Sequence, residues 1–293
     1  MALNQSCIGR EYPAVETRVS REAIRNYALA CNDDNPRYLD PAVVGGIIAP
    51  PLFGVTVTWE SLLRASGDPE VGVDVMRLLH GEQDMEFLAP IRPGDVISSR
   101  SRIASIETRA TGEALDIEVI AHNQNRNPVL RTITGLFIRG TRRERSSSPT
   151  PGAPEAARPA GEPIVVTSQT IDRDQTFRYA EASGDRNPIH LDENVARMVG
   201  LPGIIVHGLC TMAFVSRVVV DALCDRDPAR LKRLRVRFTR PVFPGQTINT
   251  LIWHDGEHGG RARYALETYN SAGQPVIRGG IAEIAPATIR ETP

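Results

Sequence analysis

Two residues with complementary proton-transfer chemistry, Asp185 and His190, lie five positions apart in the second half of the sequence. Asn187 and Pro188 stand between them, and because a residue before proline is disfavoured in the α region, the segment is expected to form a turn. A turn can direct a carboxylate and an imidazole at one water molecule. Such a pair suits the reversible addition of water to a conjugated double bond, because one group must take a proton from the water and a proton must reach the α-carbon.

The same two residues also allow a purely structural interpretation. Asp185 would then cap the turn through the amide of Asn187 or one nearby, and His190 would pack as a satisfied polar side chain. An isolated Asp and His at this spacing favour that structural interpretation. The features around them favour chemistry instead.

A second motif, Val206-His207-Gly208-Leu209, opens a long apolar segment and could supply the electrophilic partner of the reaction. Adding hydroxide at the β-carbon of an acyl thioester places negative charge on the thioester oxygen, and main-chain N–H groups at a helix start stabilise such a charge. Gly208 would let the substrate carbonyl approach the main chain closely. His207 and Asn187 are the candidate substrate-binding residues, although for His207 packing beside the glycine is favoured over contact with the substrate.

Both motifs occur in a second, altered copy in the first half of the sequence. The segment from Tyr27 to Asp40 aligns without a gap on the segment from Tyr179 to Asp192, and eight of the fourteen positions are identical, namely one Tyr, two Ala, two Asp, one Asn, one Pro and one Leu. Two later segments match in the same order, 46–52 with 203–209 and 87–94 with 238–245. These collinear matches indicate an internal repeat, so each half is expected to be one structural unit.

The first copy lacks two of the three groups that the chemistry needs. Tyr38 occupies the position of His190 and does not exchange protons near neutral pH, and Pro51 occupies the position of Gly208 and has no N–H to donate. Asp33 is the retained carboxylate. The first half is therefore expected to be non-catalytic, whereas the second half keeps the complete set.

Helices are expected on both sides of the turn. Residues 172–182 are expected to form a helix with Asp172 as a candidate N-cap, and 192–200 a short helix capped by Asp192. Residues 209–223 are apolar on nearly every side, which is typical of a buried helix.

The segment that follows the long helix has the period of β-strands. Residues 231–238 alternate between apolar and charged side chains, as a half-buried strand does. Its arginines, Arg233, Arg235 and Arg237, are expected on a solvated strand face, with contact to nucleotide phosphates as the alternative. Helices followed by strands predict a buried helix wrapped by an antiparallel sheet. Three more strands are expected, at 247–254, 261–269 and 275–284.

Length and composition are those of a packed protein. The chain has 293 residues, 41% of them apolar, and a formal net charge of −1, so no overall field attracts it to nucleic acid or to an acidic membrane surface. The four cysteines show neither zinc-site spacing nor the density of a disulfide scaffold, which favours a reducing compartment. The amino terminus lacks a signal-peptide pattern and no run of about 18 apolar residues occurs, so a cytoplasmic protein without a membrane span is expected.

The motifs together resemble those of a known family. Residues 179–196, which include Ser183-Gly-Asp-Arg-Asn-Pro-Ile-His190, resemble the signature of the MaoC-like (R)-specific enoyl-CoA hydratases, and the motif at 206–209 resembles their second motif. The resemblance implies an α+β double hot-dog fold, with two antiparallel sheets each wrapped around a central buried helix, the two helices side by side and the sheets joined. It also implies that Asp185 and His190 bind and activate the water and that the Gly208 amide polarises the thioester carbonyl. The implied reaction interconverts trans-2-enoyl-CoA and (R)-3-hydroxyacyl-CoA.

The resemblance further implies what the protein binds. The family uses neither a metal nor a redox cofactor, and coenzyme A or the phosphopantetheine of an acyl carrier protein is part of the substrate. The first half would be a degenerate partner domain that supplies one wall of the pocket, and its loss of chemistry would leave room for a long or bulky acyl chain. A homodimer is compatible with this arrangement, and the acyl-chain length stays open.

A segment rich in Pro, Ser, Gly and charge separates the two halves. It predicts a degenerate domain at 1–140, a linker at 141–162 and a catalytic domain at 163–293. Two alternative functions stay open: a hot-dog thioesterase would attack the carbonyl carbon on the same scaffold, and a non-catalytic acyl-CoA-binding protein would need no proton-transfer pair. The paired Asp185 and His190 favour hydration.

Overall fold

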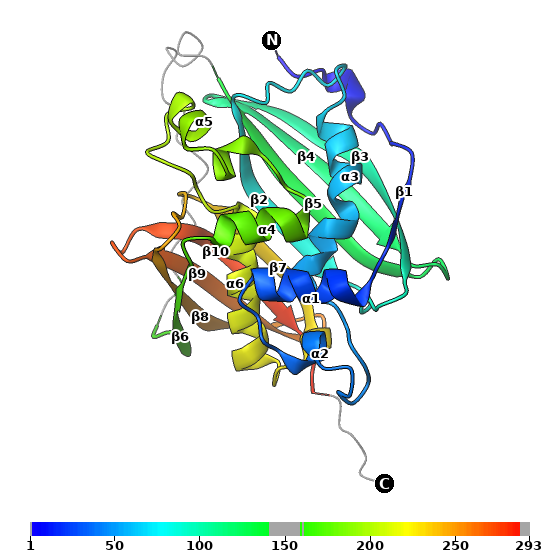
Figure 1. Cartoon of the computed structure of the whole chain (residues 1–293). Helices are drawn as coiled ribbons and strands as arrows, with labels where there is room; N and C mark the ends of the chain where they lie inside the picture. Colours follow the sequence, from blue (N-terminus) through cyan, green and yellow to red (C-terminus); the bar gives the residue numbers. More distant parts are fainter. Residues whose placement is uncertain (1, 141–158, 160, 288–293) are drawn as a thin grey trace.

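Ten antiparallel strands form one continuous sheet in the computed structural model, which describes residues 2–140, 159 and 161–287 (Figure 1). The strand order is β1-β3-β4-β5-β2-β7-β10-β9-β8-β6. From each edge to the middle, both halves have the same topology, with their first strand at the edge and their second strand at the centre. The strands are β1 (Val15–Arg18), β2 (Leu78–Phe87), β3 (Val96–Arg109), β4 (Gly112–His122), β5 (Pro128–Arg139), β6 (Val165–Thr170), β7 (Leu231–Phe238), β8 (Thr247–His258), β9 (Arg261–Asn270) and β10 (Pro275–Ile284).

The two halves of the sheet join through β2 and β7, which pair with Glu86 opposite Arg233 and Asp84 opposite Arg235. The sheets expected around the two helices are joined, as the resemblance implies, by the backbone pairing of these central strands. Arg233 binds Asp84 in a bidentate ion pair with N–O distances of 2.9 and 2.6 Å, and Arg235 pairs with Glu82. Arginines that were expected on a solvated strand face therefore link the halves across the junction.

Each half places one long helix against the sheet (Figure 1). Helix α3 (Gly54–Ser66) contacts β3 and β4, and α6 (Gly208–Leu223) contacts β6 and β7. Every residue of α6 from Leu209 to Ser216 is buried, which confirms the buried helix that the apolar segment predicts. The other helices are α1 (Arg21–Ala30), α2 (Pro36–Leu39), α4 (Gln175–Ser183) and α5 (Glu193–Met198), with 3-10 turns η1 (Gln5–Cys7), η2 (Pro51–Phe53), η4 (Pro188–His190) and η5 (Pro228–Arg230).

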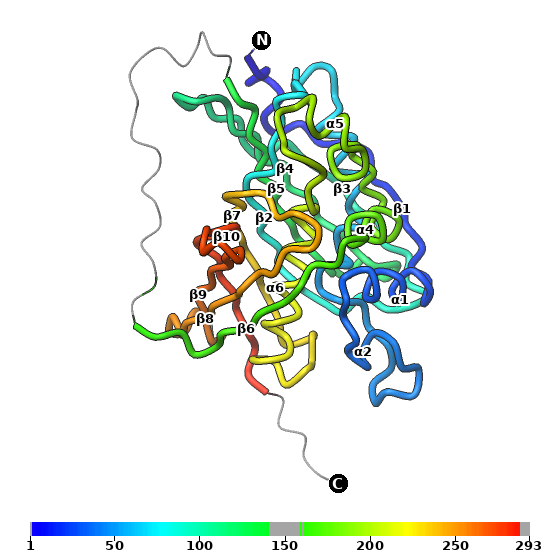
Figure 2. The backbone as a smooth tube through the Cα atoms, turned by 60° about the vertical axis from the view of Figure 1, so that its left-hand side comes forward, coloured from blue at the N-terminus to red at the C-terminus, as the bar shows by residue number. Residues whose placement is uncertain are grey.

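Equivalent residues of the two copies meet where α1 packs against α4, a contact visible in Figures 1 and 2. Tyr27 and Tyr179 occupy matching positions of the repeat and are fully buried. Their hydroxyl oxygens lie 3.4 Å apart and their rings meet edge to face at 5.7 Å. One hydrophobic core contains residues of both halves. The two copies are thus packed around a common centre, as a fused pair of related units should be.

Most elements of the second half lie where the sequence predicts them, and two findings differ. Strands β7 and β10 have the predicted bounds, and the Asp192 side chain caps α5 by accepting the N–H of Asn194 at 2.7 Å. Helix α4 begins later than expected, with Asp174 and not Asp172 at its N-cap, and the Gln175 side chain accepts the Asp172 N–H at 3.2 Å ahead of the helix. Edge strand β6 was not expected. Its residues alternate between half-buried and exposed, so no fully buried face marks it in the sequence. Figure 2 shows its course along the side of the second half.

The predicted linker at 141–162 lies outside the described residues except for Pro159, Gly161 and Glu162. The domain limits at 140 and 163 therefore stay a prediction, although β5 ends at Arg139 and β6 begins at Val165. Within the described residues, no helix combines the length and apolar character needed to cross a membrane.

Candidate active site

The turn between α4 and η4 is held by a series of side-chain to main-chain hydrogen bonds. Gly184 ends α4 in the left-handed conformation, with φ +83°, and the Ser183 hydroxyl accepts the Asp185 N–H at 3.2 Å. Asp185 Oδ1 accepts the Asn187 N–H at 3.1 Å, and Asn187 Oδ1 accepts the Ile189 N–H at 3.3 Å. The capping that a structural interpretation predicts is therefore present. It uses one carboxylate oxygen of Asp185 and no hydrogen-bonding atom of the His190 ring.

His190 is buried with its ring orientation fixed. Its Nδ1 lies 2.8 Å from the Ile205 carbonyl oxygen, and because a carbonyl can only accept, Nδ1 carries the proton and Nε2 carries the lone pair. The Thr176 hydroxyl donates to the His190 main-chain carbonyl. Side-chain ligand atoms of Asp185, His190 and His207 lie within 4.8 Å of one another. The structure therefore brings together the two residues predicted to share the proton chemistry.

His207 also lies in this cluster. Its Nε2 donates to the Asp185 main-chain oxygen at 3.0 Å, and its ring stacks on that of His190 with centroids 3.8 Å apart and planes 27° apart. Its other neighbour is Tyr179, at a ring centroid distance of 4.9 Å. Among the described residues, Nδ1 of His207 has no hydrogen-bond partner. Asn187, the other candidate for substrate binding, is exposed in the turn between α4 and η4.

Burial moves the pKa values of the carboxyl and the imidazole toward each other. It raises the pKa of Asp185, although the nearby His190 and the Asn187 N–H oppose the rise. It lowers the pKa of His190, which the Asp185 charge partly offsets. Two groups with converging pKa values can exchange a proton at small cost, as general acid–base catalysis requires.

Gly208 is the first residue of α6 and lies beside the aromatic ring of Phe238. The first intrahelical hydrogen bond runs from the Thr211 N–H to the His207 carbonyl at 3.0 Å, so the Gly208 N–H has no partner within the helix. A Cβ at position 208 would lie 3.3 Å from Phe238 Cε1, which is close contact. An N–H without an intrahelical partner at a helix start, on a residue that has no side chain of its own, can stabilise a developing oxyanion.

The first copy forms the same turn without the other groups. Asp33 Oδ1 accepts the Asn35 N–H at 3.2 Å, as Asp185 does with Asn187, and burial raises the pKa of Asp33 to about 6. Tyr38 is fully buried and its hydroxyl has no hydrogen-bond partner in the described part of the chain. Pro51 lines a small apolar pocket at the start of the helical segment of this half. The retained aspartate is thus a turn former here.

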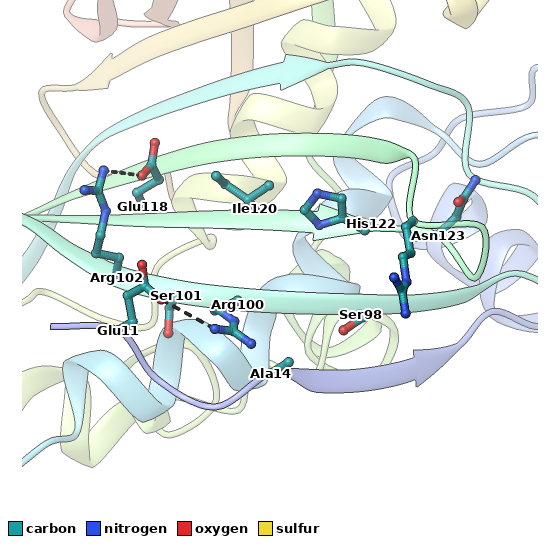
Figure 3. A pocket seen from close by; sticks show the side chains of 11 residues that line it. Glu11, Ala14, Ser98, Arg100, Ser101, Arg102, Glu118, Ile120, His122 and Asn123 are labelled. Atoms are coloured by element: carbon teal, nitrogen blue, oxygen red, sulfur yellow. Dashed lines mark hydrogen bonds and ion pairs between the residues drawn. The ribbon is translucent and has the colours of Figure 1, made fainter. Parts of the chain in front are cut away.

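A separate cleft of about 470 Å³ lies over β3 and β4 of the first half (Figure 3). Its charged side chains are largely paired, Arg102 with Glu118 at 2.6 Å and Arg100 with Glu11 at 3.4 Å. None of the three clustered residues described above lines it. It is therefore distinct from the candidate active site.

The Asp185, His190 and His207 cluster has donor atoms close enough for a metal ion, but its geometry fits one poorly. The two imidazoles are stacked, so their in-plane lone pairs run side by side and do not converge, and each ring already donates one N–H to a carbonyl. The predicted absence of a metal and of a cofactor stays a prediction. The hydrogen bond to the Ile205 carbonyl and the stacking of the two rings could not be predicted from the sequence, because neither a main-chain acceptor nor a ring orientation has a sequence signature.

Comparison with known proteins adds family information to this geometry. A family model described as "MaoC like domain" matches residues 155–274, and one described as "FAS1-like, dehydratase domain region" matches residues 6–132. The chain is 30% identical over 251 residues to a probable enoyl-CoA hydratase 2 of Dictyostelium discoideum, covering 84% of this chain and 85% of the relative. It is 34% identical over 259 residues to 3-hydroxyacyl-thioester dehydratase Y of Mycobacterium tuberculosis, covering 84% and 81%.

A solved structure shares the whole fold. The crystal structure of a MaoC-like dehydratase from Phytophthora capsici superposes with a TM-score of 0.83 at 25% identity, covering 99% of this chain and 100% of the other. The similarity includes both halves of the ten-stranded sheet. The predicted double hot-dog fold is confirmed.

Proposed function

The chain belongs to the MaoC-like dehydratase family, and on that basis we propose that it catalyses reversible hydration of a trans-2-enoyl thioester to an (R)-3-hydroxyacyl thioester. It is an enzyme of the hydro-lyase class. The observation that carries the proposal is the pair of half-buried Asp185 and buried His190, with converging pKa values, in the half that also keeps an N–H without a partner within α6 at the start of that helix. The first half has lost two of these groups.

Asp185 and His190 would exchange protons with the substrate while sharing one proton between them. With Asp185 protonated and His190 neutral, Nε2 takes a proton from water as the water oxygen bonds to the β-carbon. The π electrons move toward the thioester oxygen, where the Gly208 N–H and the α6 dipole stabilise the enolate. Asp185 then gives its proton to the α-carbon, and transfer of a proton from His190 to Asp185 restores the pair. One water is added, and no other atom is gained or lost.

The test of the proposed function is the loss of enoyl absorbance with crotonyl-CoA and longer trans-2-enoyl-CoA substrates. We expect hydration without release of free CoA. Release of CoA from these thioesters without hydration would place the chain with the thioesterases, and tight binding without turnover would make it an acyl-CoA-binding protein.

The carrier of the acyl group is proposed to be coenzyme A or an acyl carrier protein. Rates on matched acyl groups attached to each carrier decide between them. The oligomeric state stays open, with a homodimer compatible with the fold, and the cytoplasmic location stays a prediction. Sedimentation and cell fractionation test these two points.

Hydration is expected to follow a narrow bell-shaped dependence of kcat/KM on pH. At low pH a second proton on the pair removes the base, and at high pH loss of the last proton removes the acid. Because burial raises the pKa of Asp185 and lowers that of His190, the acidic limb should lie above the ordinary aspartate pKa of about 3.9 and the alkaline limb below the ordinary histidine pKa of about 6.5. Initial rates across that interval, with enzyme stability checked at each pH, measure the curve. A flat profile there would contradict shared proton chemistry.

Gly208→Pro is expected to lower kcat by about 10²–10³-fold, because proline removes the N–H proposed to stabilise the enolate. The backbone should accept it, since Pro51 occupies the matching position and the residue before it, Pro50, has φ −53° and ψ 147°, close to His207 with −56° and 136°. Gly208→Ala is the matched control, because it adds the same Cβ but keeps the N–H. Equal losses in both variants would assign the effect to crowding against Phe238 and not to the lost donor.

A further inference from the structure

The His207 ring is held between two aromatic side chains, and within the described residues its side chain hydrogen-bonds to the main chain of Asp185. It is 1% exposed, so little of its surface can reach a substrate. From its contacts we infer that His207 is a positioning residue, which holds Asp185 and His190 in register and does not bind the substrate. The inference rests on the proposed function, and it gives a catalytic purpose to the packing that the sequence favours over substrate contact.

The hydrogen bond of His207 acts on the main chain of Asp185. Its Nε2–H donates to the Asp185 carbonyl oxygen at 3.0 Å, which ties the turn to the residue preceding α6. The Asp185 carboxylate is held from its other side by the Asn187 N–H at 3.1 Å. With the main chain and Oδ1 both fixed, Oδ2 is the carboxylate oxygen left to face a reacting water.

The ring of His207 acts on His190. The two imidazoles stack at 3.8 Å, and the Ile205 carbonyl fixes His190 in the ring plane through Nδ1–H at 2.8 Å. Stacking limits tilting of the His190 ring and the hydrogen bond limits its rotation, so the lone pair on Nε2 points in one fixed direction. Behind His207 lies Tyr179, whose hydroxyl contacts Tyr27 at the centre of the molecule. The support therefore extends into the rigid core.

The charge state of His207 also favours a positioning role. Burial, and then the neighbouring His190, lower the pKa of His207 to about 3. His207 is thus neutral at any pH where the enzyme would work. A neutral ring can lie against His190 without repelling the proton that His190 must accept during hydration.

The first copy shows that the fold does not require a histidine at this position. Pro50 occupies the matching position, where it offers no side-chain donor, and the Asp33 turn still forms. The half that lost the partner of Asp33, with Tyr38 in place of histidine, also lacks the equivalent of His207. The side-chain donor at this position is therefore present in the half that has the proton-transfer pair and absent from the half that has only the turn.

Two substitutions separate the hydrogen bond from the ring. His207→Gln keeps an N–H donor without the aromatic ring, and His207→Phe keeps the ring without the donor. We expect His207→Phe to lower kcat by about 10²-fold, as displacement of a catalytic group by roughly 1 Å does. His207→Gln should stay within about tenfold of the wild type. KM for crotonyl-CoA, and the Kd of the unreactive thioester butyryl-CoA by calorimetry, should change less than about twofold in both.

A rise in KM or in the butyryl-CoA Kd at unchanged kcat would overturn the inference and return His207 to substrate binding. Equal losses in both variants would overturn the role of the Nε2–H. Thermal unfolding of each variant beside the wild type shows whether the fold is intact.

A readout without turnover separates this inference from the proposed function. The pKa of His190, followed by NMR of labelled protein and assigned by the signal missing in His190→Asn, should fall in His207→Phe, because the Asp185 charge that raises it moves away. It should be unchanged in His207→Gln. An unchanged value in both variants would overturn the positioning role. If the wild type hydrates no enoyl thioester while the pKa behaves as expected, the proposed function fails and the positioning role stands.

Discussion

His190→Asn is expected to lower kcat for hydration by about 10²–10⁴-fold, the range typical of a lost acid–base group. The substitution removes Nε2, the ring nitrogen that carries the lone pair when Nδ1–H binds the Ile205 carbonyl. The asparagine amide can still donate to the Ile205 carbonyl, which Nδ1–H of His190 binds at 2.8 Å, so the turn should keep its shape. His190→Ala should lose at least as much activity and also some stability, because a buried carbonyl loses its donor.

Tyr38→Phe is the matched control for this prediction. Tyr38 occupies the position of His190 in the first copy, and its buried hydroxyl has no hydrogen-bond partner in the described residues. Its removal should leave both rate and stability nearly unchanged. Full activity in His190→Asn on a substrate that the wild type accepts would contradict the proposed mechanism.

Asp185→Asn should cost a comparable 10²–10⁴-fold, or about the same as loss of the histidine, because the pair works as one unit. The substitution is nearly isosteric, and the amide oxygen can still accept the Asn187 N–H that Asp185 Oδ1 accepts at 3.1 Å. The turn is therefore preserved while the titrating group is removed. Initial rates with crotonyl-CoA and a pH profile measure the effect, and the bell-shaped curve should disappear.

Asp33→Asn makes the same chemical change in the first copy, where Asp33 Oδ1 accepts the Asn35 N–H at 3.2 Å. It should leave the rate unchanged. If both variants lost activity equally, the aspartates would be turn formers in both halves and the catalytic assignment of Asp185 would be wrong.

Much of the fold could be predicted because its signals are local. The apolar run at 209–223 and the alternation at 231–238 each mark an element by its own period, and the structure has α6 and β7 there. The joining of the two sheets has no such signal. It depends on β2 pairing with β7 across a long separation in sequence, and the partner of Arg233, Asp84, is visible only once that register is known.

The candidate site, like the fold, could be predicted from the sequence only in part. Asp185, His190 and Gly208 could be singled out because they lie in two short motifs and because the first copy shows two of them replaced. The contacts that orient these residues could not be predicted. Every residue has a main-chain carbonyl, so the sequence does not show that the one of Ile205 accepts a hydrogen bond from His190. The role of His207 is clear only from such contacts. Its side-chain type allows substrate contact as well as the favoured packing, and its burial and its bond to the Asp185 carbonyl indicate positioning.

The most direct test of the central claim is the identity of the product formed from a trans-2-enoyl-CoA by the wild type and by Asp185→Asn. Mass spectrometry of the wild-type reaction should show an acyl-CoA heavier by one water and no free CoA, and chiral chromatography of that product should show the (R) configuration at the 3-hydroxyl. Asp185→Asn should form almost none of this product. Free CoA with no hydrated product in the wild-type reaction, or equal hydration by both proteins, would contradict it.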